Sequence, residues 1–196
     1  MYGPVEAPTR HAVQPRLRGR FGRDWLYVES TPSTQRLLAV DAPEGAVAVA
    51  GEQTEGRGRL GRRWEVAAGT SLLLSVQLRP RLEAARWPEL TVLSSRAVAG
   101  AIEAVTGLPA ELKHPNDVLV RGGKVAGVLA EATEGRVVLG IGINVNVPAD
   151  DLPADVRLPA TSLLAELGAP VDRVELAVEL LDRLERAYDA WNATGR

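Results

Sequence analysis

The sequence predicts one α+β domain in which a mixed, mostly antiparallel sheet is flanked by helices. The first observation is a pair of apolar segments, 118–120 and 124–131, joined by Arg121-Gly122-Gly123, which is typical of an antiparallel hairpin. The second is a repeat of apolar residues every three or four positions over 90–105 and again over 174–191. That period indicates two amphipathic helices long enough to cover a sheet.

Length and composition allow one sizeable hydrophobic core. The chain has 196 residues, of which 45% are hydrophobic and 24% charged, as is ordinary for a soluble globular protein. No apolar run approaches the roughly 18 residues of a membrane span, so we expect no membrane partner. The chain has no cysteine, which excludes disulfides, thiol nucleophiles and thiolate metal sites and fits a reducing cytoplasm.

Charge is distributed unevenly along the chain. Residues 1–23 carry five arginines and one glutamate, so the rest of the chain has a formal net charge of -6 against -2 for the whole. We expect 1–23 to be an irregular, solvated basic segment and 24–196 to form the domain. An acidic body binds nucleic acid poorly, so no DNA partner is expected.

Local signals place the individual elements. The strands expected in chain order are 25–28, 46–50, 70–78, 118–120, 124–131 and 136–147. Hydroxyl side chains at Ser33 and Thr34 predict the start of a helix over 33–40, and Gly107 is expected to end the long helix. Asp172 and Glu175 resemble a capping box at the start of the C-terminal helix.

The segment 56–63 alternates glycine with arginine and has almost no apolar surface, so we expect a mobile loop. Glycine lets backbone N–H groups approach a ligand, and arginine presents a fork of donors that matches phosphate and carboxylate oxygens. The segment therefore predicts an anion site. A solvated basic loop and an RNA-binding module are the alternatives. A P-loop is excluded because its Gly-x-x-x-x-Gly-Lys-Ser/Thr pattern occurs nowhere.

Two other places are candidates for ligand contact. Gly140 and Gly142 interrupt a strand pattern, which indicates a bulge or a ligand lying against the backbone. Ser33 or Thr34 could be an N-cap, and a helix N-terminus is also a ready anion site, so both roles stay open.

Three separated strings resemble the motifs of one family, the biotin protein ligases. Gly56-Arg57-Gly58-Arg59-Leu60-Gly61-Arg62-Arg63-Trp64 is similar to the family's Gly-Arg-Gly-Arg-x-Gly-x-x-Trp adenylate loop. Lys113-His114-Pro115-Asn116-Asp117 resembles its Lys-Trp-Pro-Asn-Asp, with His114 replacing tryptophan, and Gly140-Ile141-Gly142-Ile143-Asn144 matches Gly-x-Gly-x-Asn. Further elements of the family follow in the same order at Ser33-Thr34-Gln35, Gln53 and Lys124. The resemblance covers about residues 25–190.

The resemblance implies the fold shared by class II aminoacyl-tRNA synthetases and biotinyl synthetases. It also implies an ATP-dependent ligase that activates biotin to biotinyl-5'-AMP and transfers it to a lysine of a biotin carboxyl carrier protein. ATP and Mg²⁺ are the implied cofactors, with Mg²⁺ carried on the triphosphate and no certain metal ligand in the chain. Lys124 and Arg59 are the implied catalytic residues. The residues implied to bind biotin or the adenylate are Ser33, Thr34, Gln35, Gln53, Gly56, Arg57, Gly58, Arg59, Arg62, Trp64, Lys113, Asn116, Asp117, Lys124, Gly127, Gly140 and Asn144.

Within this scheme Lys124 would bridge carboxylate and phosphate oxygens while the arginines stabilise charge in the transition state. A lysine that only keeps an edge strand soluble is the alternative for Lys124. Asn116 would be a partner for Mg²⁺ or phosphate and Asp117 a candidate base. A turn or cap role stays open for both residues.

Two domains of the family have no counterpart in this sequence. The winged helix-turn-helix of repressor-type members is missing, so operator binding is not expected. The small SH3-like C-terminal domain is missing too, which would make this a truncated or minimal form. The sequence leaves the oligomeric state open, and a homodimer is one of the states it allows. The alternative functions are a lipoate or octanoate ligase of the related fold and, ranked lower, an RNA-binding module.

Overall fold

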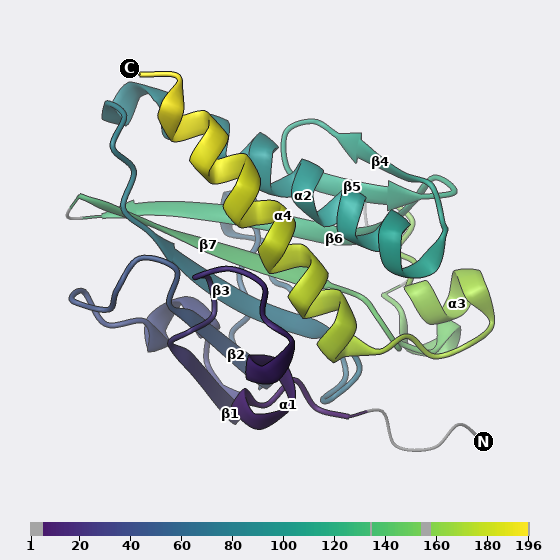
Figure 1. The fold of residues 1–196 in the computed structure, drawn as a ribbon. Helices are drawn as coiled ribbons and strands as arrows, with labels where there is room; N and C mark the ends of the chain where they lie inside the picture. Colours follow the sequence, from purple (N-terminus) through teal and green to yellow (C-terminus); the bar gives the residue numbers. More distant parts are fainter. Residues whose placement is uncertain (1–5, 134, 154–157, 196) are drawn as a thin grey trace.

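The computed structural model describes residues 6–133, 135–153 and 158–195. Its centre is one seven-stranded sheet with strand order β1-β2-β3-β7-β6-β5-β4 (Figure 1). The strands are β1 (Trp25–Thr31), β2 (Val47–Gln53), β3 (Leu72–Leu78), β4 (Ala110–Lys113), β5 (Asp117–Val120), β6 (Gly123–Thr133) and β7 (Arg136–Ile143). Only the β1 and β2 pair is parallel, so the predicted mixed, mostly antiparallel sheet is confirmed.

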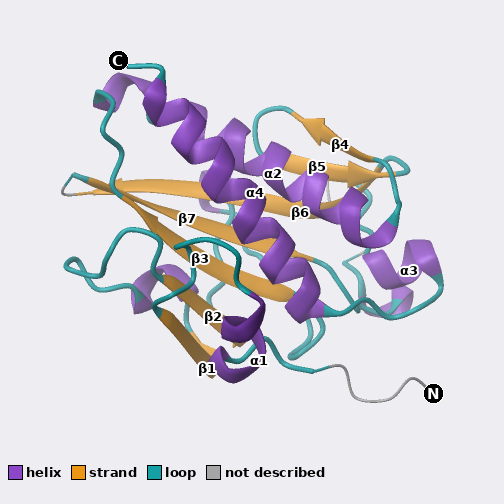
Figure 2. Cartoon of the chain, viewed as in Figure 1, coloured by secondary structure: helices purple, strands orange, loops and turns teal. Residues whose placement is uncertain are grey.

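Two long helices, α2 (Glu89–Thr106) and α4 (Arg173–Ala193), lie on the same face of this sheet and pack against each other (Figures 1 and 2). Apolar residues of the strands point towards them because successive side chains of a strand alternate between faces. On β7, Leu139 and Ile141 belong to this core, whereas Gly140 and Gly142 point to the opposite face. That second face, free of the long helices, carries the polar residues of the sheet.

The ends of the two helices follow from local sequence. Gly107 caps α2 with a φ of 71°, a left-handed conformation that glycine adopts without strain. The Asp172 side chain accepts hydrogen bonds from the backbone N–H groups of Val174 and Glu175 at the start of α4. Both predicted helix boundaries are confirmed, and the predicted apolar stripe of α4 is buried.

The basic N-terminal segment is not the solvated tail that the sequence suggested. Within its described part, α1 (Arg10–Val13) is followed by a 3₁₀ turn, Gln14–Arg16, and the side chains of Val13, Leu17 and Phe21 are buried in the core. Acidic side chains of α4 and its N-cap neutralise Arg16, Arg18 and Arg20. The ion pairs are Arg16 with Asp172 at 3.3 Å, Arg18 with Glu179 at 3.0 Å, Arg20 with Glu185 at 2.8 Å and Arg20 with Asp189 at 2.5 Å. We call residues 10–23 the N-terminal arm.

Three other parts of the structure were not predicted correctly from the sequence. The helix predicted over 33–40 is a single 3₁₀ turn, Thr34–Leu37, because the backbone is already extended at Leu38. The short elements β4 and α3 (Leu163–Leu167) carried no sequence signal strong enough to be predicted. The 3₁₀ turn Ala149–Asp151 was not predicted either, and positions 154–157 after it lie outside the described residues. No helix among the described residues is long and apolar enough to cross a lipid bilayer.

Candidate active site

A cavity of about 670 Å³ lies on the sheet face that the long helices leave open. All the predicted site residues line it except Gly56, which lines a smaller adjacent hollow on the other side of the loop. Its walls are supplied by the segment 33–35, strands β2 and β6, strand β7 with the adjoining Asn144, the loop 56–64 and the turn between β4 and β5. The sequence thus identified residues from six separate segments that the fold brings together.

One end of the cavity is polar but uncharged. The side-chain oxygen of Gln53 accepts hydrogen bonds from the backbone N–H of Thr34 at 2.8 Å and from its hydroxyl at 3.1 Å. The Thr34 hydroxyl also lies 2.7 Å from the hydroxyl of Ser75 on β3. The amide nitrogen of Gln53 has no hydrogen-bond partner within the described part of the chain, so it can donate to a ligand. We call Thr34, Gln53 and Ser75 the polar end.

The glycines of β6 and β7 make room for side chains of the site itself. A Cβ atom at Gly142 would lie 2.7 Å from the ring of Trp64, and one at Gly127 would lie 3.1 Å from the same ring. At Gly140 the neighbour is Gln35, whose Cδ would be 3.1 Å away. The expected close approach at Gly140 and Gly142 is therefore present, and its immediate cause is protein side chains that form the cavity wall.

Lys124 begins the return strand of the hairpin and is held by an ion pair. Its ammonium lies 2.7 Å from the Asp117 carboxylate and 5.4 Å from the centre of the Trp64 ring. The Asn116 amide nitrogen donates to the same carboxylate at 3.2 Å. With its side chain 24% exposed, Lys124 faces the cavity in a defined position, which argues against the role of a solubilising edge lysine.

The loop 56–64 folds back on itself as a short, irregular hairpin. Trp64 donates its backbone N–H to the Gly56 carbonyl at 2.9 Å, and Gly58 donates to the Arg62 carbonyl at 2.8 Å. Leu60, at the tip, has a φ of 62° and is 85% exposed. These few backbone bonds close the loop, but it has no buried apolar side chain of its own between Arg57 and Arg63.

The arginines of this loop are only partly neutralised. Arg57 pairs with Glu131 of β6 at 2.6 Å, and Arg59 donates to the side-chain oxygen of Asn116 at 3.1 Å. The Arg62 guanidinium has no hydrogen-bond or ion-pair partner among the described residues, although it lines the cavity. Positive charge therefore faces the middle of the cavity, where an anion would be stabilised.

The far end of the cavity contains a buried polar atom without a partner. Asn144 is 4% exposed, and its amide nitrogen donates to the Thr161 carbonyl at 3.0 Å. Its side-chain oxygen is buried and has no hydrogen-bond partner among the described residues. Leu158 and Ala160 line the cavity beside it. A buried acceptor of this kind indicates a donor supplied by a ligand.

Several residues of the site were missed from sequence. Ser75 contributes to the polar end, Glu131 neutralises Arg57, and Leu158 and Ala160 help to line the far end. For Ser75 a signal existed, because a serine inside an otherwise apolar strand requires a polar partner. Nothing in the local sequence marks Glu131, whose importance comes from strand pairing that places it beside the loop.

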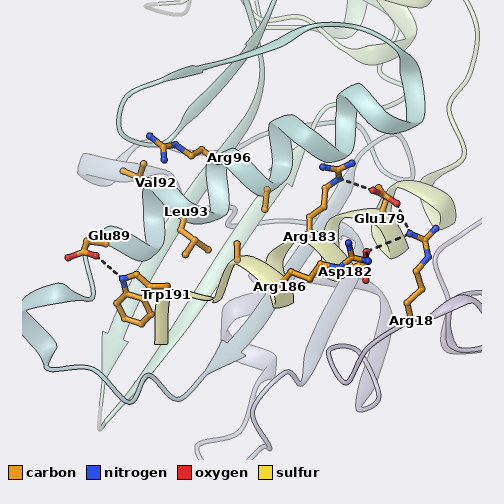
Figure 3. A pocket seen from close by; sticks show the side chains of 12 residues that line it. Arg18, Glu89, Val92, Leu93, Arg96, Glu179, Asp182, Arg183, Arg186 and Trp191 are labelled. Atoms are coloured by element: carbon orange, nitrogen blue, oxygen red, sulfur yellow. Dashed lines mark hydrogen bonds and ion pairs between the residues drawn. The ribbon is translucent and has the colours of Figure 1, made fainter. Parts of the chain in front are cut away.

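A larger hollow of about 860 Å³ lies elsewhere, between α2 and α4 (Figure 3). Several of its charged side chains pair with one another: Glu179 pairs with Arg183 at 2.7 Å and with Arg18 at 3.0 Å. None of the predicted site residues lines this hollow. Size alone thus does not identify the site, whereas the convergence of charged and unpaired polar groups does.

Comparison with known proteins agrees with the geometry. Residues 27–147 match the model of the biotin/lipoate A/B protein ligase family. This chain belongs to that family. The match covers the polar end, the loop 56–64, the hairpin with Lys124 and strand β7 with Asn144.

Relatives in the family include two bacterial proteins. The bifunctional ligase/repressor BirA of Bacillus subtilis is 38% identical over 176 residues, which is 85% of this chain and 54% of the relative. The biotin--[acetyl-CoA-carboxylase] ligase of Mycobacterium tuberculosis is 41% identical over 174 residues, which is 84% of this chain and 64% of the relative. The chain thus spans about half the length of BirA.

A solved structure shares the architecture of most of this chain. The biotin protein ligase of Aquifex aeolicus, in complex with biotin and ATP, superposes with a TM-score of 0.79 at 33% identity. The superposition covers 87% of this chain and 72% of the Aquifex chain. The expectation of an α+β fold of the biotinyl synthetase type is therefore confirmed.

Proposed function

We propose that this chain is an ATP-dependent biotin protein ligase, which forms biotinyl-5'-AMP and transfers biotin to a lysine of a biotin carboxyl carrier protein. One observation carries the proposal: a single cavity joins a neutral polar end, a cationic middle and a buried, unpaired acceptor. Biotinyl-5'-AMP has a neutral ureido head, a phosphate in its centre and a nucleobase with an exocyclic amine. The order of groups in the site matches the order in that molecule.

Each part of the cavity would bind one part of the intermediate. The polar end would bind the ureido group, with the free amide nitrogen of Gln53 donating to the ureido carbonyl. Trp64 and the glycine-lined sheet would enclose the apolar chain of biotin. The unpaired oxygen of Asn144 would accept a hydrogen bond from the adenine amine.

In the first step an oxygen of the biotin carboxylate attacks the α-phosphorus of ATP, the P–O bond to the β-phosphate breaks, and pyrophosphate leaves. Both reactants are anions, so their repulsion has to be cancelled. Lys124, held by Asp117 at 2.7 Å, would bridge carboxylate and phosphate oxygens, while Arg59 and Arg62 add charge that strengthens binding of the transition state.

Mg²⁺ would enter this step together with the triphosphate. No group of three or more histidine, aspartate or glutamate side chains that could hold a metal ion occurs among the described residues. The Asn116 oxygen near the phosphate region fits a hard cation or its bound water. When bound, the ion would neutralise charge on the phosphates.

In the second step an acceptor amine attacks the acyl carbon of the mixed anhydride, the C–O bond to phosphate breaks, and AMP leaves. The amine must lose a proton, and Asp117 is the candidate base at this end of the cavity. Its carboxylate already accepts from Lys124 and Asn116, so we assign it first the task of positioning Lys124. A cytoplasmic location and a carboxylase carrier as acceptor belong to the same proposal; the Mycobacterium relative is named for acetyl-CoA carboxylase.

The lipoate or octanoate ligase alternative predicts a different ligand for the same cationic middle. A fatty acyl chain has no group that would satisfy the Gln53 amide, so the polar end favours biotin. Isothermal titration of the purified protein with biotin, lipoate and octanoate, each with and without MgATP, tests the choice. In the titration we expect heat of binding for biotin. In a separate assay with MgATP we expect pyrophosphate to be released only when biotin is present. Binding of lipoate but not biotin would overturn the proposal.

A further inference from the structure

Arg136, the first residue of β7, is a buried cation that the reaction described above does not use. It is 8% exposed. Its guanidinium donates to the backbone carbonyls of Leu38 at 3.2 Å and Ala39 at 2.9 Å, and to the side-chain oxygen of Gln77. All three acceptors are neutral, and no ion pair to a carboxylate involves Arg136 among the described residues. Burying a guanidinium without a counter-ion is unfavourable, so the hydrogen bonds that Arg136 donates must offset the cost of its burial.

The acceptors belong to the segment that directly follows the 3₁₀ turn Thr34–Leu37. Leu38 and Ala39 lie outside any helix or strand, and the Ala39 carbonyl accepts one backbone hydrogen bond, from the Ala42 N–H at 3.2 Å. Arg136 donates hydrogen bonds to the carbonyls of Leu38 and Ala39. Gln77, whose oxygen accepts from Arg136, donates its own amide to the Ala42 carbonyl. The pair thus ties residues 38–42 to the centre of the sheet.

The other end of the same turn forms the polar end of the cavity. Thr34 bonds to Gln53 and Ser75, and Gln35 lies over Gly140 with its amide nitrogen 3.4 Å from the carbonyls of both Leu129 and Val138. A turn of four residues has little stability of its own. Its position therefore depends on anchors at both ends, and Arg136 is the buried anchor at the far end.

We propose that Arg136 is a positioning residue for the binding of the biotin head group. By fixing residues 38–42, it holds the turn Thr34–Leu37 against the sheet and so sets the place of Thr34 and Gln35 in the cavity. Arg136 does not touch the ligand. The inference rests on the proposed function for its ligand, but the ordering of the turn is a property of the free protein and can be measured separately.

The chain supplies a matched control in Arg79. This arginine also donates to the segment, to the carbonyls of Val40 at 2.7 Å and Ala42 at 3.0 Å, but from the exposed side of the protein. Water can replace its hydrogen bonds when it is removed, whereas water has no access to the buried guanidinium of Arg136. The two arginines therefore separate a buried anchor from a surface contact.

The experiment compares Arg136→Met, Arg136→Lys and Arg79→Met with the unmodified chain. For Arg136→Met we expect the Kd for biotin to rise by about tenfold or more, equivalent to about 1.4 kcal/mol, while the KM for MgATP changes by less than about twofold. Arg136→Lys keeps the charge but not the fork of donors, so its Kd for biotin should lie between those of the unmodified chain and Arg136→Met. Arg79→Met should bind biotin as the unmodified chain does.

Amide hydrogen exchange of residues 33–42 in the free protein is the second measurement. We expect faster exchange in Arg136→Met than in Arg79→Met, with the strands β3 and β7 unchanged. A folded Arg136→Met that binds biotin normally, or one in which biotin and MgATP binding weaken equally, would overturn the inference. If Arg136→Met does not fold, Arg136→Lys is judged by the same two criteria. Failure of the unmodified chain to bind biotin would instead refute the proposed function and leave the exchange result standing.

Discussion

Two arginine-rich regions of this chain, the N-terminal arm and the loop 56–64, have opposite surroundings. In the arm, Arg16, Arg18 and Arg20 each meet a carboxylate of α4 or of its N-cap. In the loop, Arg57 has one carboxylate, Arg59 has a neutral amide and Arg62 has no side-chain partner among the described residues. Three of the arm's five arginines are thus neutralised by carboxylates of the fold, whereas Arg59 and Arg62 of the loop are left for a ligand.

The difference also lies in packing. Phe21 of the arm is buried, contacts the Tyr188 ring at a centroid distance of 5.8 Å, and donates its backbone N–H to Glu185 at 2.9 Å. Apolar burial thus fixes the arm, and its ion pairs add to a position already determined. Between Arg57 and Arg63 the loop has no such anchor. Arginine content alone therefore says little about role; burial and counter-charge decide it.

The largest effect is expected at the cation that the proposed chemistry uses most directly. Lys124→Ala should leave the fold intact, because Lys124 is not part of the hydrophobic core, but should lower the rate of adenylate formation by about a hundredfold or more. Such a loss corresponds to about 3 kcal/mol of transition-state stabilisation. Biotin-dependent pyrophosphate release measures it. Normal release by a folded variant would exclude Lys124 from the chemistry.

A smaller effect is expected from the loop. Arg59→Ala should weaken retention of biotinyl-5'-AMP by about tenfold, because one charge-assisted contact to the phosphate is lost, while the Kd for biotin alone changes little. Dissociation of the intermediate can be followed by rapid filtration. Arg63→Ala is the matched control, since Arg63 pairs only with exposed Glu65. Equal effects of both variants would show that the loop retains the intermediate through its total positive charge and not through a specific contact of Arg59.

The contrast between the regions can be sharpened at Glu131. This carboxylate pairs with Arg57 of the loop at 2.6 Å, so a ligand phosphate has to compete with it for Arg57. Glu131→Gln should therefore tighten binding of biotinyl-5'-AMP by about threefold, as expected for a half-exposed ion pair worth less than about 1 kcal/mol. Glu55→Gln, which removes the exposed partner of Arg36, is the control. Weaker binding by Glu131→Gln would mean that Glu131 positions Arg57 for the ligand.

The smallest effect is expected in the arm and concerns stability. Arg20→Met should lower the free energy of unfolding by less than about 1 kcal/mol at neutral pH, because the pair with Asp189 is half exposed. The hydrogen bond from Arg20 lowers the pKa of Asp189, so this contribution is fully present above the ordinary aspartate pKa of about 3.9 and decreases as the pH falls from there through the lowered pKa of the folded state. Urea unfolding at pH 7 and pH 3 should show a smaller difference between the two proteins at pH 3 than at pH 7. A difference that is equal or larger at pH 3 would contradict the assignment, and adenylate formation at neutral pH should be unchanged.

Local signals made much of the fold predictable from sequence. Gly107 ends α2 and Asp172 starts α4 because capping involves residues only a few positions apart. The hairpin around Arg121 was predictable for the same reason. The prediction of a helix over 33–40 was wrong, because the backbone is extended at Leu38. The contacts of Leu38 there are with residues distant in the chain, namely a hydrogen bond from Arg136 and packing in one apolar cluster with Val138, which the local sequence does not show.

The arm shows what local sequence does not contain. Its arginines looked solvated because their partners on α4 lie more than 150 positions away in the chain. The site was found because short motifs carry its residues, yet Ser75 and Glu131 were missed since only the pairing of β3 and β6 with β7 places them there. Long-range pairing is the information that local patterns lack.

Limited digestion with trypsin tests the comparison most directly, because both regions contain arginines at which the protease cuts. Without ligand we predict rapid cleavage after Arg57, Arg59, Arg62 or Arg63 and slow cleavage after Arg18 and Arg20 in the arm. Saturating biotin with MgATP should protect the loop, since the phosphate of the intermediate neutralises its arginines, and should leave the arm unchanged. Equal cleavage of the loop with and without biotin and MgATP would contradict the account that its arginines await the anion of the intermediate.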